Sequence, residues 1–187
     1  MSIEVADDLP PERMTGVLGR EEIVRRIRSA RPLLVGLLDE GRQVQPNGVD
    51  LSLRAIARFE GVGTLAADNA GRELPSTMAI PFAEDGFTTL APGPYQVIFN
   101  EVVDLPNDLM ALGRPRSSLC RCGVLLHTAV WDAGYRGRST ALLVVANPLG
   151  FRIERAARLL QLVFLLLAAP TADGYSGQYQ REHLAEN

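Results

Sequence analysis

The chain has 187 residues, of which 47% are hydrophobic and 22% are charged, and its formal net charge is −3. This length predicts one domain with a core large enough to need no disulfide or metal staple. The small negative charge argues against bulk nucleic-acid binding, which usually needs a large basic excess. All 19 basic residues are arginines, so any phosphate site must rely on guanidinium groups.

The two cysteines, Cys120 and Cys122, are too close in sequence to favour a disulfide between them in regular structure. A zinc site would need a second Cys/His pair, and the remaining candidates, His127 and His183, are far apart in the sequence. We therefore expect reduced thiols in a cytoplasmic protein. The acidic N-terminus lacks a signal-peptide pattern, and the apolar run 159–169 is too short to cross a bilayer.

The N-terminal part of the chain is predicted to hold the main helix. Residues 1–15 carry few apolar anchors and are expected to be a flexible extension. The segment Gly19 to Ala30 is predicted to be helical, because it places acids in its first turn, arginines toward its end and apolar residues on one face. Pro32 would end this helix.

The rest of the chain has the pattern of strands. Residues 49–53 and 95–99 alternate between apolar and polar, whereas 142–146 and 159–167 are continuous apolar runs that predict strands buried on both faces. The 12 prolines and 17 glycines interrupt the chain at short intervals. This pattern is typical of an all-β sandwich or barrel rather than of alternating β and α units.

Two segments are expected to lie outside the main sheet. Residues 61–78 are polar and glycine-rich, which predicts a surface loop or hairpin. After Pro170 the sequence becomes small and polar, with Tyr175 and Tyr179. We expect this segment to be an arm that closes over a ligand or wraps onto a neighbouring subunit.

The turn Arg116-Ser117-Ser118 is a candidate phosphate site. It follows Pro115 and precedes a segment predicted to form a helical turn. An arginine and two hydroxyls at a helix start can hold a phosphate through side chains, backbone amides and the helix dipole. An ordinary helix N-cap is the alternative, and for such a turn in isolation it is the commoner one.

Asp132 is a candidate base in the sequence Trp-Asp-Ala-Gly-Tyr-Arg-Gly, which predicts a tight hairpin. A lone carboxylate there could activate a water molecule, although an aspartate in a turn more often only stabilises the turn. The aromatic ring of Tyr135, just beyond it, would give a flat wall for a sugar or a base. His127 lies near by in the sequence, but an isolated histidine is more often structural, so we do not assign it as the base.

Three further polar residues precede or interrupt strand patterns. Asp50 follows the turn Gln45-Pro46-Asn47-Gly48, where it is either a capping residue or a second carboxylate that organises a site or a metal-bound water. Arg158 and Gln161 begin the last apolar run. A buried amide without a partner costs about 1–3 kcal/mol, so Gln161 is expected to face a ligand or another subunit.

The order of five segments is more specific than any one of them. QPNGVDL, PRSSL, HTAVWDAGYRG, ARLLQLVF and YSGQYQ occur in this order between Gly19 and Leu184. Together they resemble the trimeric dUTPase / dCTP deaminase superfamily over nearly the whole chain. The first and last segments are most similar to the deaminases and the archaeal-type dUTPases. The last segment differs from the glycine-rich phosphate-binding tail of common dUTPases.

The resemblance implies a distorted, jelly-roll-like β-barrel over residues 16–170, with a short N-terminal helix and an arm over 171–187 that closes the active site. It also implies a homotrimer with active sites at subunit interfaces. It places Asp132 on the water-activating carboxylate and Tyr135 on the ring that packs against deoxyribose and disfavours a 2′-hydroxyl.

The same resemblance implies roles for the remaining candidates. Asp50 and Gln161 match the acid of the first motif and the glutamine of the fourth. The backbone from His127 to Asp132 would read the pyrimidine edge. The predicted substrate-binding residues are Arg116, Ser117, Ser118, His127, Trp131, Tyr135, Arg158, Tyr175, Tyr179 and Gln180, and Mg²⁺ is the expected cofactor, with no protein ligand assigned to it.

One position separates the two activities of the superfamily. Its deaminases carry a proton-transferring glutamate three residues before an asparagine that here matches Asn147, so the corresponding residue is Val144. Valine cannot transfer a proton. The spacing after Gly137 is two residues longer than usual, which could shift this alignment, but no acid occurs between Arg138 and Arg152.

The sequence therefore predicts a dUTP diphosphatase that releases dUMP and pyrophosphate. Two alternatives stay open at this point. One is a dCTP deaminase, alone or combined with hydrolysis. The other is a non-catalytic trimer on the same fold that binds deoxynucleotides in a regulatory role.

Overall fold

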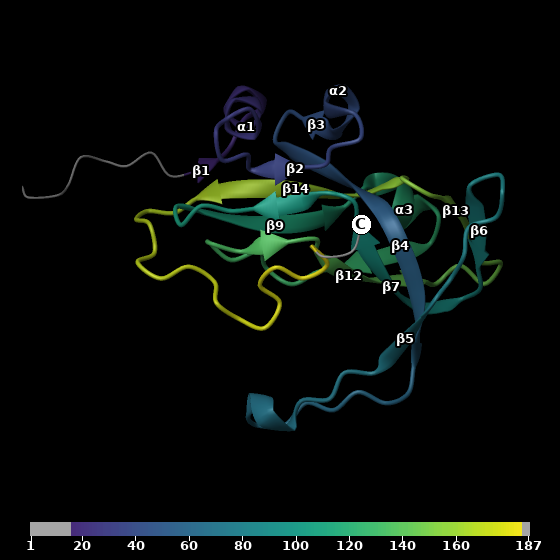
Figure 1. Cartoon of the computed structure of the whole chain (residues 1–187). Helices are drawn as coiled ribbons and strands as arrows, with labels where there is room; N and C mark the ends of the chain where they lie inside the picture. The colour runs from purple at the N-terminus through teal and green to yellow at the C-terminus, as the bar shows by residue number, and fades with distance from the viewer. Residues whose placement is uncertain (1–15, 185–187) are drawn as a thin grey trace, which may run out of the picture.

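The computed structural model describes residues 16–184, so the predicted extension (1–15) and the end of the predicted arm (185–187) lie outside the described residues. Antiparallel strands dominate the structure (Figure 1) and confirm the predicted all-β class. No helix among the described residues is long and apolar enough to span a membrane.

Short helices connect many strands in chain order. The helical segments are α1 (Arg20–Ile27), α2 (Glu40–Gln43), η1 (Asn69–Gly71) and α3 (Ser117–Arg121). The strands are β1 (Gly16–Val17), β2 (Leu34–Val35), β3 (Val44–Gln45), β4 (Gly48–Glu60), β5 (Ser76–Ala79), β6 (Phe87–Leu90), β7 (Gly93–Phe99), β8 (Val102–Asp104), β9 (Leu109–Pro115), β10 (Val124–His127), β11 (Arg136–Gly137), β12 (Thr140–Val145), β13 (Phe151–Glu154) and β14 (Arg158–Leu166).

The long strand β4 organises the main sheet, whose order is β1-β14-β4-β7-β12-β10. Residues 49–52 of β4 pair with β14, whereas residues 53–58 pair with β7 after a register shift between Leu53 and Ala55. Such an irregularity bends a strand and increases its twist. The sheet therefore curls on itself, as Figure 1 shows, and encloses the core.

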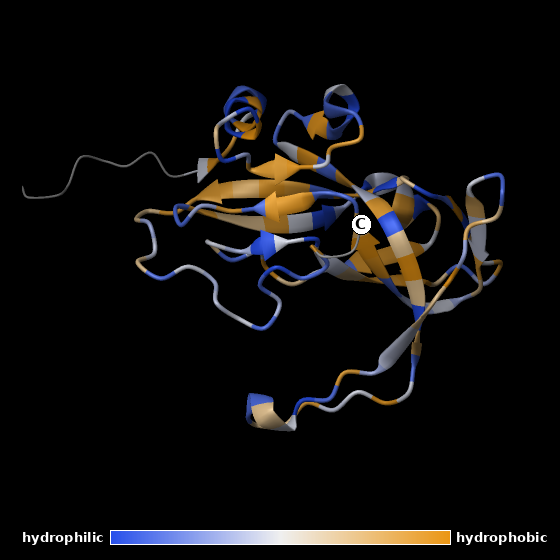
Figure 2. Cartoon of the chain, in the orientation of Figure 1, coloured by the Kyte–Doolittle hydropathy of each residue, from blue (hydrophilic) through white to orange (hydrophobic). Residues whose placement is uncertain are grey.

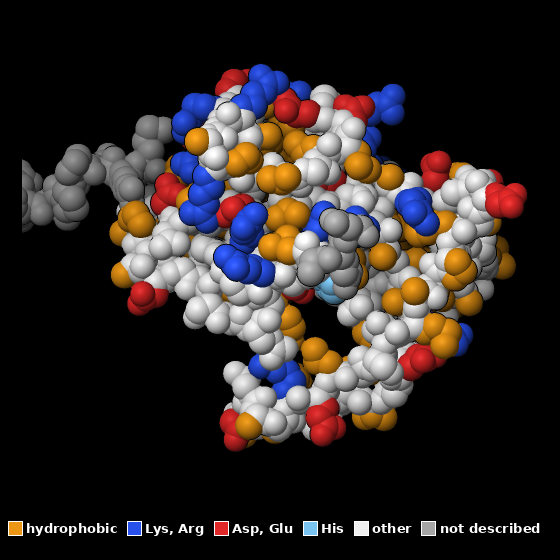
Figure 3. Space-filling view, in the orientation of Figure 1, with side chains coloured by type: hydrophobic (Ala, Val, Ile, Leu, Met, Phe, Trp, Pro, Cys, Tyr) orange, Lys and Arg blue, Asp and Glu red, His pale blue; other side chains and the backbone are white. Residues whose placement is uncertain are grey.

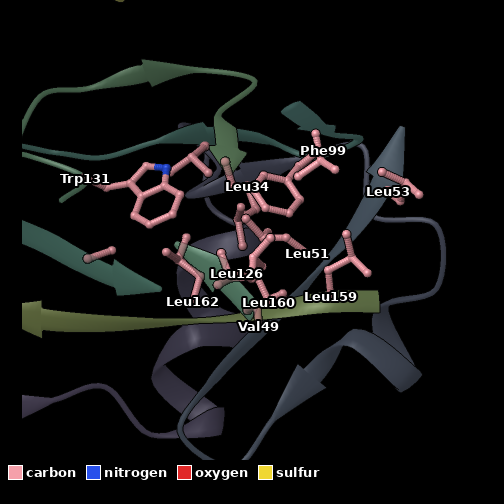
Figure 4. Packing of buried hydrophobic residues seen from close by; sticks show 14 of the residues in the cluster. Leu34, Val49, Leu51, Leu53, Phe99, Leu126, Trp131, Leu159, Leu160 and Leu162 are labelled. Carbon is pink, nitrogen blue, oxygen red and sulfur yellow. The ribbon is translucent and has the colours of Figure 1, made fainter. Parts of the chain in front are cut away.

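Alternating residues of β4 and β14 fill the core. Val49, Leu51 and Leu53 of β4 are fully buried, as are Leu160 and Leu162 of β14. Figure 4 shows these side chains, which come from the two paired strands, packed together in the core. Burying each such aliphatic side chain contributes about 1.5–3 kcal/mol to folding. Asp50 of β4, and Arg158 and Gln161 of β14, therefore lie on strands that also carry buried residues of the core.

Several predicted boundaries need correction. The helix covers Arg20–Ile27 instead of 19–30, so it has already ended when Pro32 is reached. The apolar run 142–146 forms β12, but this strand is not buried on both faces, because Leu142 is 37% exposed and pairs with the exposed His127 of the edge strand β10. Figure 2 shows apolar residues along these strands.

The segment predicted as a surface loop or hairpin forms a hairpin that projects from the body. The end of β4 pairs with β5, and Thr64 and Glu73 form an isolated bridge farther out. Val62 and Leu65 on this hairpin are more than 80% exposed, at 87% and 81%. In Figure 3 an opening lies between the projecting hairpin and the body, and the hairpin tip reaches back to the arm, where Arg72 lies over Tyr179.

A buried carboxylate ties the first half of β4 to the β7–β8 connection. Glu101 is fully buried. It accepts hydrogen bonds from the backbone N–H of Ser52 at 2.9 Å, from the Ser52 hydroxyl at 2.6 Å and from Gln43 Nε2 at 2.6 Å. Gln43 Nε2 also donates to the backbone oxygen of Asp50 at 2.8 Å. The network thus fixes the backbone that carries Asp50.

The burial of Glu101 predicts a pH-dependent stability. Burial raises the pKa of Glu101, although its hydrogen bonds oppose this. The folded state then binds the proton more tightly than the unfolded state. The stabilising contribution is therefore complete below the ordinary glutamate pKa and is lost as the pH rises through the raised value. We therefore expect the unfolding free energy of wild type, relative to that of Glu101→Gln, to fall as the pH rises from the ordinary glutamate pKa through the raised pKa of Glu101.

Urea unfolding at a series of pH values measures this difference, because the titration of all other groups cancels between the two proteins. The matched control is Glu154→Gln, which changes an exposed glutamate on β13 and should give a difference independent of pH. A flat difference for Glu101→Gln would contradict the assignment.

Candidate functional site

Four polar residues predicted from separate motifs meet on one side of the sheet. Strand β14 lies between β4 and β9, and its register places Gln161 opposite both Asp50 of β4 and Arg114 of β9. Arg158 begins β14, and Arg116 follows β9 as the N-cap of α3. We call Asp50, Arg116, Arg158 and Gln161 the Asp50 cluster.

Asp50 is shared by two arginines. Its Oδ2 lies 3.1 Å from Arg116 Nε and 3.2 Å from Arg158 Nη1. The Asp50 side chain is 3% exposed, whereas those of Arg116 and Arg158 are 33% and 30% exposed. Burial raises the pKa of the Asp50 carboxyl, and the two guanidinium groups oppose this. One buried anion therefore holds two cations that still reach the surface.

Two hydroxyls extend this positive surface. Ser117 and Ser118 are exposed at the start of α3, and no side chain caps this helix. The alternative of an ordinary serine N-cap is therefore wrong for α3. Arg121 Nη1 lies 3.4 Å from the Ser117 hydroxyl. The side of the molecule that holds the Asp50 cluster thus presents arginine and serine donors, which suit an oxyanion.

A second group of candidates lines a pocket of about 280 Å³. We call it the Tyr135 pocket. Its lining comprises Ala129, Val130, Trp131, Asp132, Tyr135, Ser139, Thr140, Tyr175, Tyr179 and Glu182. It combines aromatic and apolar walls with a few polar groups, the usual composition of a small-molecule site.

The turn that carries Asp132 differs from the predicted hairpin. Trp131 forms a bridge with Ala111 of β9, whereas Arg136 pairs with Asp104 of β8. The two sides of the turn are therefore held by different strands and not by each other. Tyr135 N donates to Asp132 O at 3.1 Å, and Gly134 takes a φ of 82° that favours glycine.

The side chains of this turn point in different directions. Asp132 is exposed and borders both the Tyr135 pocket and a neighbouring pocket under the arm. Tyr135 is buried, and its ring lies edge-on to Tyr175, with centroids 5.8 Å apart. Trp131 is 4% exposed and points into the core in Figure 4, so it forms a wall of the pocket from the inside.

The C-terminal arm packs on its own chain. Tyr175 N donates to Ala133 O at 2.7 Å. Gln180 Nε2 donates to Gly134 O at 2.9 Å, and Gln180 Oε1 accepts from Arg136 N at 2.8 Å. Tyr179 is 37% exposed, and Arg72 of the projecting hairpin lies over its ring, 5.8 Å from the centroid. The arm therefore covers the turn that carries Asp132.

Some predicted residues are not brought together. His127 is exposed on β10 and does not line the Tyr135 pocket, although the neighbouring residues 129 and 130 do. No hydrogen bond or ion pair among residues 16–184 joins the Asp50 cluster to the Tyr135 pocket. Among the described residues the candidates thus form two groups that share no hydrogen bond or ion pair, and we call them the two half-sites.

Ser139 and Glu182 are among the pocket residues that sequence reasoning missed. Ser139 is buried and lies 3.1 Å from the Tyr135 hydroxyl, whereas Glu182 accepts from that hydroxyl at 2.8 Å. Both types are common on surfaces, so neither gave a signal in the sequence. Only the fold of the arm brings Glu182 to this place.

No three His, Cys, Asp or Glu side chains converge on a metal-sized site within residues 16–184. Mg²⁺ commonly keeps several waters and binds through substrate phosphates and one or two carboxylates. Among the residues that line the Tyr135 pocket, the exposed carboxylate of Asp132 is an oxygen donor of the kind that such an ion accepts.

Comparison with known proteins gives consistent matches. Residues 17–167 match the profile of the dCTP deaminase-like family. A protein of Methanosarcina mazei named probable deoxyuridine 5′-triphosphate nucleotidohydrolase is 47% identical, covering 89% of this chain and 98% of its own length. A protein of Archaeoglobus fulgidus with the same name is 45% identical, with coverages of 90% and 98%.

A solved structure shares the fold. The 2′-deoxycytidine 5′-triphosphate deaminase of Agrobacterium tumefaciens superposes with a TM-score of 0.63 at 23% identity, covering 82% of this chain and 49% of that one. At this identity the likeness supports the architecture alone.

The shared carboxylate predicts a stability effect. Asp50→Asn keeps the shape of the side chain but leaves Arg116 and Arg158 without a counter-ion. We expect the unfolding free energy to fall by about 1–3 kcal/mol, less than for a fully buried pair because the arginines reach solvent. Urea unfolding tests this. Asp85→Asn breaks the exposed pair with Arg152 and should cost less than about 1 kcal/mol; equal losses would contradict the prediction.

Proposed function

The chain belongs to the dCTP deaminase-like family, and on this premise we propose that it hydrolyses dUTP to dUMP and pyrophosphate. The archaeal relatives that it matches over nearly their whole length carry the name of this activity. The observation that carries the proposal is the exposed carboxylate of Asp132 at the rim of a pocket whose size and walls suit a nucleoside.

Asp132 is proposed as the general base. Its carboxylate would take a proton from a water molecule while the water oxygen attacks the α-phosphorus of dUTP. The bond from the α-phosphorus to the bridging oxygen then breaks, and the electron pair leaves with pyrophosphate. An exposed position suits this role, because the water must reach the carboxylate and a positioned base of this kind contributes about 10²–10⁴-fold to the rate.

The Asp50 cluster is proposed as the triphosphate site. Arg116 and Arg158 would bind phosphate oxygens, helped by the Ser117 and Ser118 hydroxyls. Asp50 would hold the two guanidinium groups in place, and Gln161, which lies beside it in the register, would complete the polar surface. In this assignment the two guanidinium groups bind phosphate while they stay paired with the buried carboxylate of Asp50.

The Tyr135 pocket is proposed as the nucleoside site. The ring of Tyr135 would pack against the deoxyribose, with Trp131 as the wall behind it. The backbone of 127–132 would bind the pyrimidine edge, and His127 would contribute only through that backbone because its side chain is outside the pocket. Tyr175, Tyr179 and Gln180 would close the site as the arm, whose proposed extent is 171–187 on a barrel of 16–170.

A homotrimer is proposed because the two half-sites do not meet within one chain. An interface between subunits would bring the Asp50 cluster of one subunit to the Tyr135 pocket of another. The outer face of β10 and β12 supports such an interface, because Leu125 and Leu142 are 45% and 37% exposed and exposed apolar residues grouped on one face favour association.

Mg²⁺ is the proposed cofactor. Bound to the phosphates of the substrate, it would neutralise charge and orient the chain of phosphates for in-line attack. Arg116 and Arg158 would bind the phosphate oxygens that the ion leaves free. The exposed thiols of Cys120 and Cys122 fit the further proposal of a cytoplasmic location, where thiols stay reduced.

Deamination of dCTP is the second candidate, favoured by the family match. The strand β12 and its flanks supply no acid between Arg138 and Arg152. Glu182 reaches the Tyr135 pocket from the arm, but its carboxylate is engaged by the Tyr135 hydroxyl. Hydrolysis without deamination is therefore the better-supported activity.

Removal of the proposed base should separate turnover from binding. Asp132→Asn keeps the size of the side chain but cannot accept the proton, so we expect the turnover rate to fall about 10²–10⁴-fold. Calorimetry should show dUTP affinity within a few-fold of wild type. Asp85→Asn, an exposed aspartate on the β6 side of the molecule, is the control. Turnover that survives in Asp132→Asn would remove this residue from the mechanism.

The products identify the reaction class. We expect wild type with Mg²⁺ to release pyrophosphate from dUTP and no ammonia from dCTP, because no acid lies between Arg138 and Arg152, where the deaminases carry their proton-transferring glutamate. Product assays across the deoxynucleoside triphosphates, with and without Mg²⁺, measure this. Ammonia released at a rate comparable to dUTP hydrolysis would establish a deaminase, and dUTP binding without any product would establish a regulatory protein.

A further inference from the structure

The Tyr135 hydroxyl connects the arm to the pocket. Glu182 of the arm accepts a hydrogen bond from this hydroxyl at 2.8 Å. On its other side the same hydroxyl lies 3.1 Å from Ser139 Oγ. Ser139 Oγ in turn accepts from Trp131 Nε1. Three side chains from residues 131–139 and one from the arm thus form one continuous line of hydrogen bonds.

The chemistry of these groups fixes the direction of the line. The indole of Trp131 can only donate, and an ionised Glu182 can only accept. Because the single proton of Tyr135 goes to the carboxylate, Ser139 donates to the Tyr135 oxygen. Every donor then has an acceptor, and the line ends on a charge, which strengthens its last hydrogen bond. Tyr135 is therefore held at its hydroxyl from two sides.

The burial of Tyr135 agrees with this direction, whereas the burial of Glu182 acts against it. Burial raises the pKa of Tyr135, so its hydroxyl keeps the proton that it donates. Burial also raises the pKa of Glu182, whereas the hydrogen bond from Tyr135 and the neighbouring His183 oppose this. Of the two contacts that favour the ionised carboxylate, one comes from Tyr135 across the pocket and the other from His183 within the arm.

The backbone of the arm is strained to place Glu182. The residues on either side, Arg181 and His183, take left-handed φ values of 66° and 52°, which cost free energy for residues other than glycine. Three contacts hold this shape: Arg181 N donates to Arg136 O at 2.7 Å, Arg138 N donates to Glu182 O at 3.0 Å, and Arg138 Nη1 donates to His183 O at 2.9 Å.

The close approach of the two side chains also requires a glycine. A Cβ at residue 137 would lie 2.6 Å from the Tyr135 hydroxyl and 3.1 Å from Glu182 Cγ. Gly137 therefore leaves the space in which the tyrosine and the glutamate meet.

We propose that Glu182 is a positioning residue that fixes the Tyr135 ring and thereby sets the discrimination between deoxyribose and ribose. The inference rests on the proposed function, in which this ring packs against the sugar. A ring held at its hydroxyl by Glu182 and Ser139, and at its edge by Tyr175, cannot withdraw to admit a 2′-hydroxyl. A ring that has lost Glu182 can move, and the ribonucleotide is then accepted more readily.

The test compares kcat/KM for dUTP and UTP in matched variants. We expect Glu182→Ala to lower the dUTP/UTP ratio about tenfold, within the range that a few lost contacts in a pocket can produce. Glu182→Gln should keep the ratio within about twofold, because its amide oxygen still accepts from the tyrosine. Tyr135→Phe should lower the ratio as Glu182→Ala does, and the double variant should lower it no further.

A purely structural role predicts a different result. Loss of folded protein or of arm closure lowers activity toward both nucleotides alike and leaves the ratio unchanged, and that outcome would overturn the inference. A ratio lost equally in Glu182→Gln and Glu182→Ala would also overturn it, because the hydrogen bond would not be the cause. Glu154→Ala, on the exposed side of β13, is the control.

The failure of this inference is distinguishable from that of the proposed function. A wild-type protein that does not hydrolyse dUTP would overturn the proposed function. A wild-type protein that hydrolyses dUTP, together with an unchanged ratio in Glu182→Ala, would overturn only the role of Glu182. If Glu182→Ala does not fold, Tyr135→Phe decides in the same way, since it removes the same hydrogen bond and keeps the arm contacts of Gln180.

Discussion

The position of β14 between β4 and β9 is the constraint on which the site depends. Its register sets Gln161 beside Asp50 on one edge and Arg114 on the other. It also lets Arg158 share the buried carboxylate with Arg116. A shift of one residue would turn the polar side chains inward and the buried leucines outward. The packing that fixes Leu160 and Leu162 in the core therefore also fixes Arg158 relative to Asp50.

The second half-site depends on contacts of another kind. The turn carrying Asp132 is held by β8 and β9 at its two ends, and the arm lies over it through backbone and amide hydrogen bonds. Few apolar side chains hold the arm, and most of its contacts are individual hydrogen bonds. Segments held in this way are drawn from the less stable parts of a fold, which suits a part that must admit a nucleotide and release products.

Much of the fold could be predicted from residue patterns. The alternation at 49–53 and 95–99 identified β4 and β7, and the apolar run at 159–167 identified β14. The predictions were wrong where burial or pairing depends on segments that are distant in the sequence. The run at 142–146 is buried on one face only, because nothing among the described residues fully covers Leu142 on the other face. The turn at Asp132 is no hairpin, because its two flanks pair with different strands. Periodicity describes one strand and carries no information about its partner.

The sequence by itself determined the strand-rich class, the arginine-only basic surface and the order of motifs that marks the dCTP deaminase-like family. These follow from residue type and local spacing, which need no knowledge of distant contacts. The tertiary structure alone decided that Asp50 is a buried anion between two arginines, that the predicted site divides into two halves, and that Glu182 reaches Tyr135. Each of these depends on pairing between segments far apart in the chain, which local sequence does not encode.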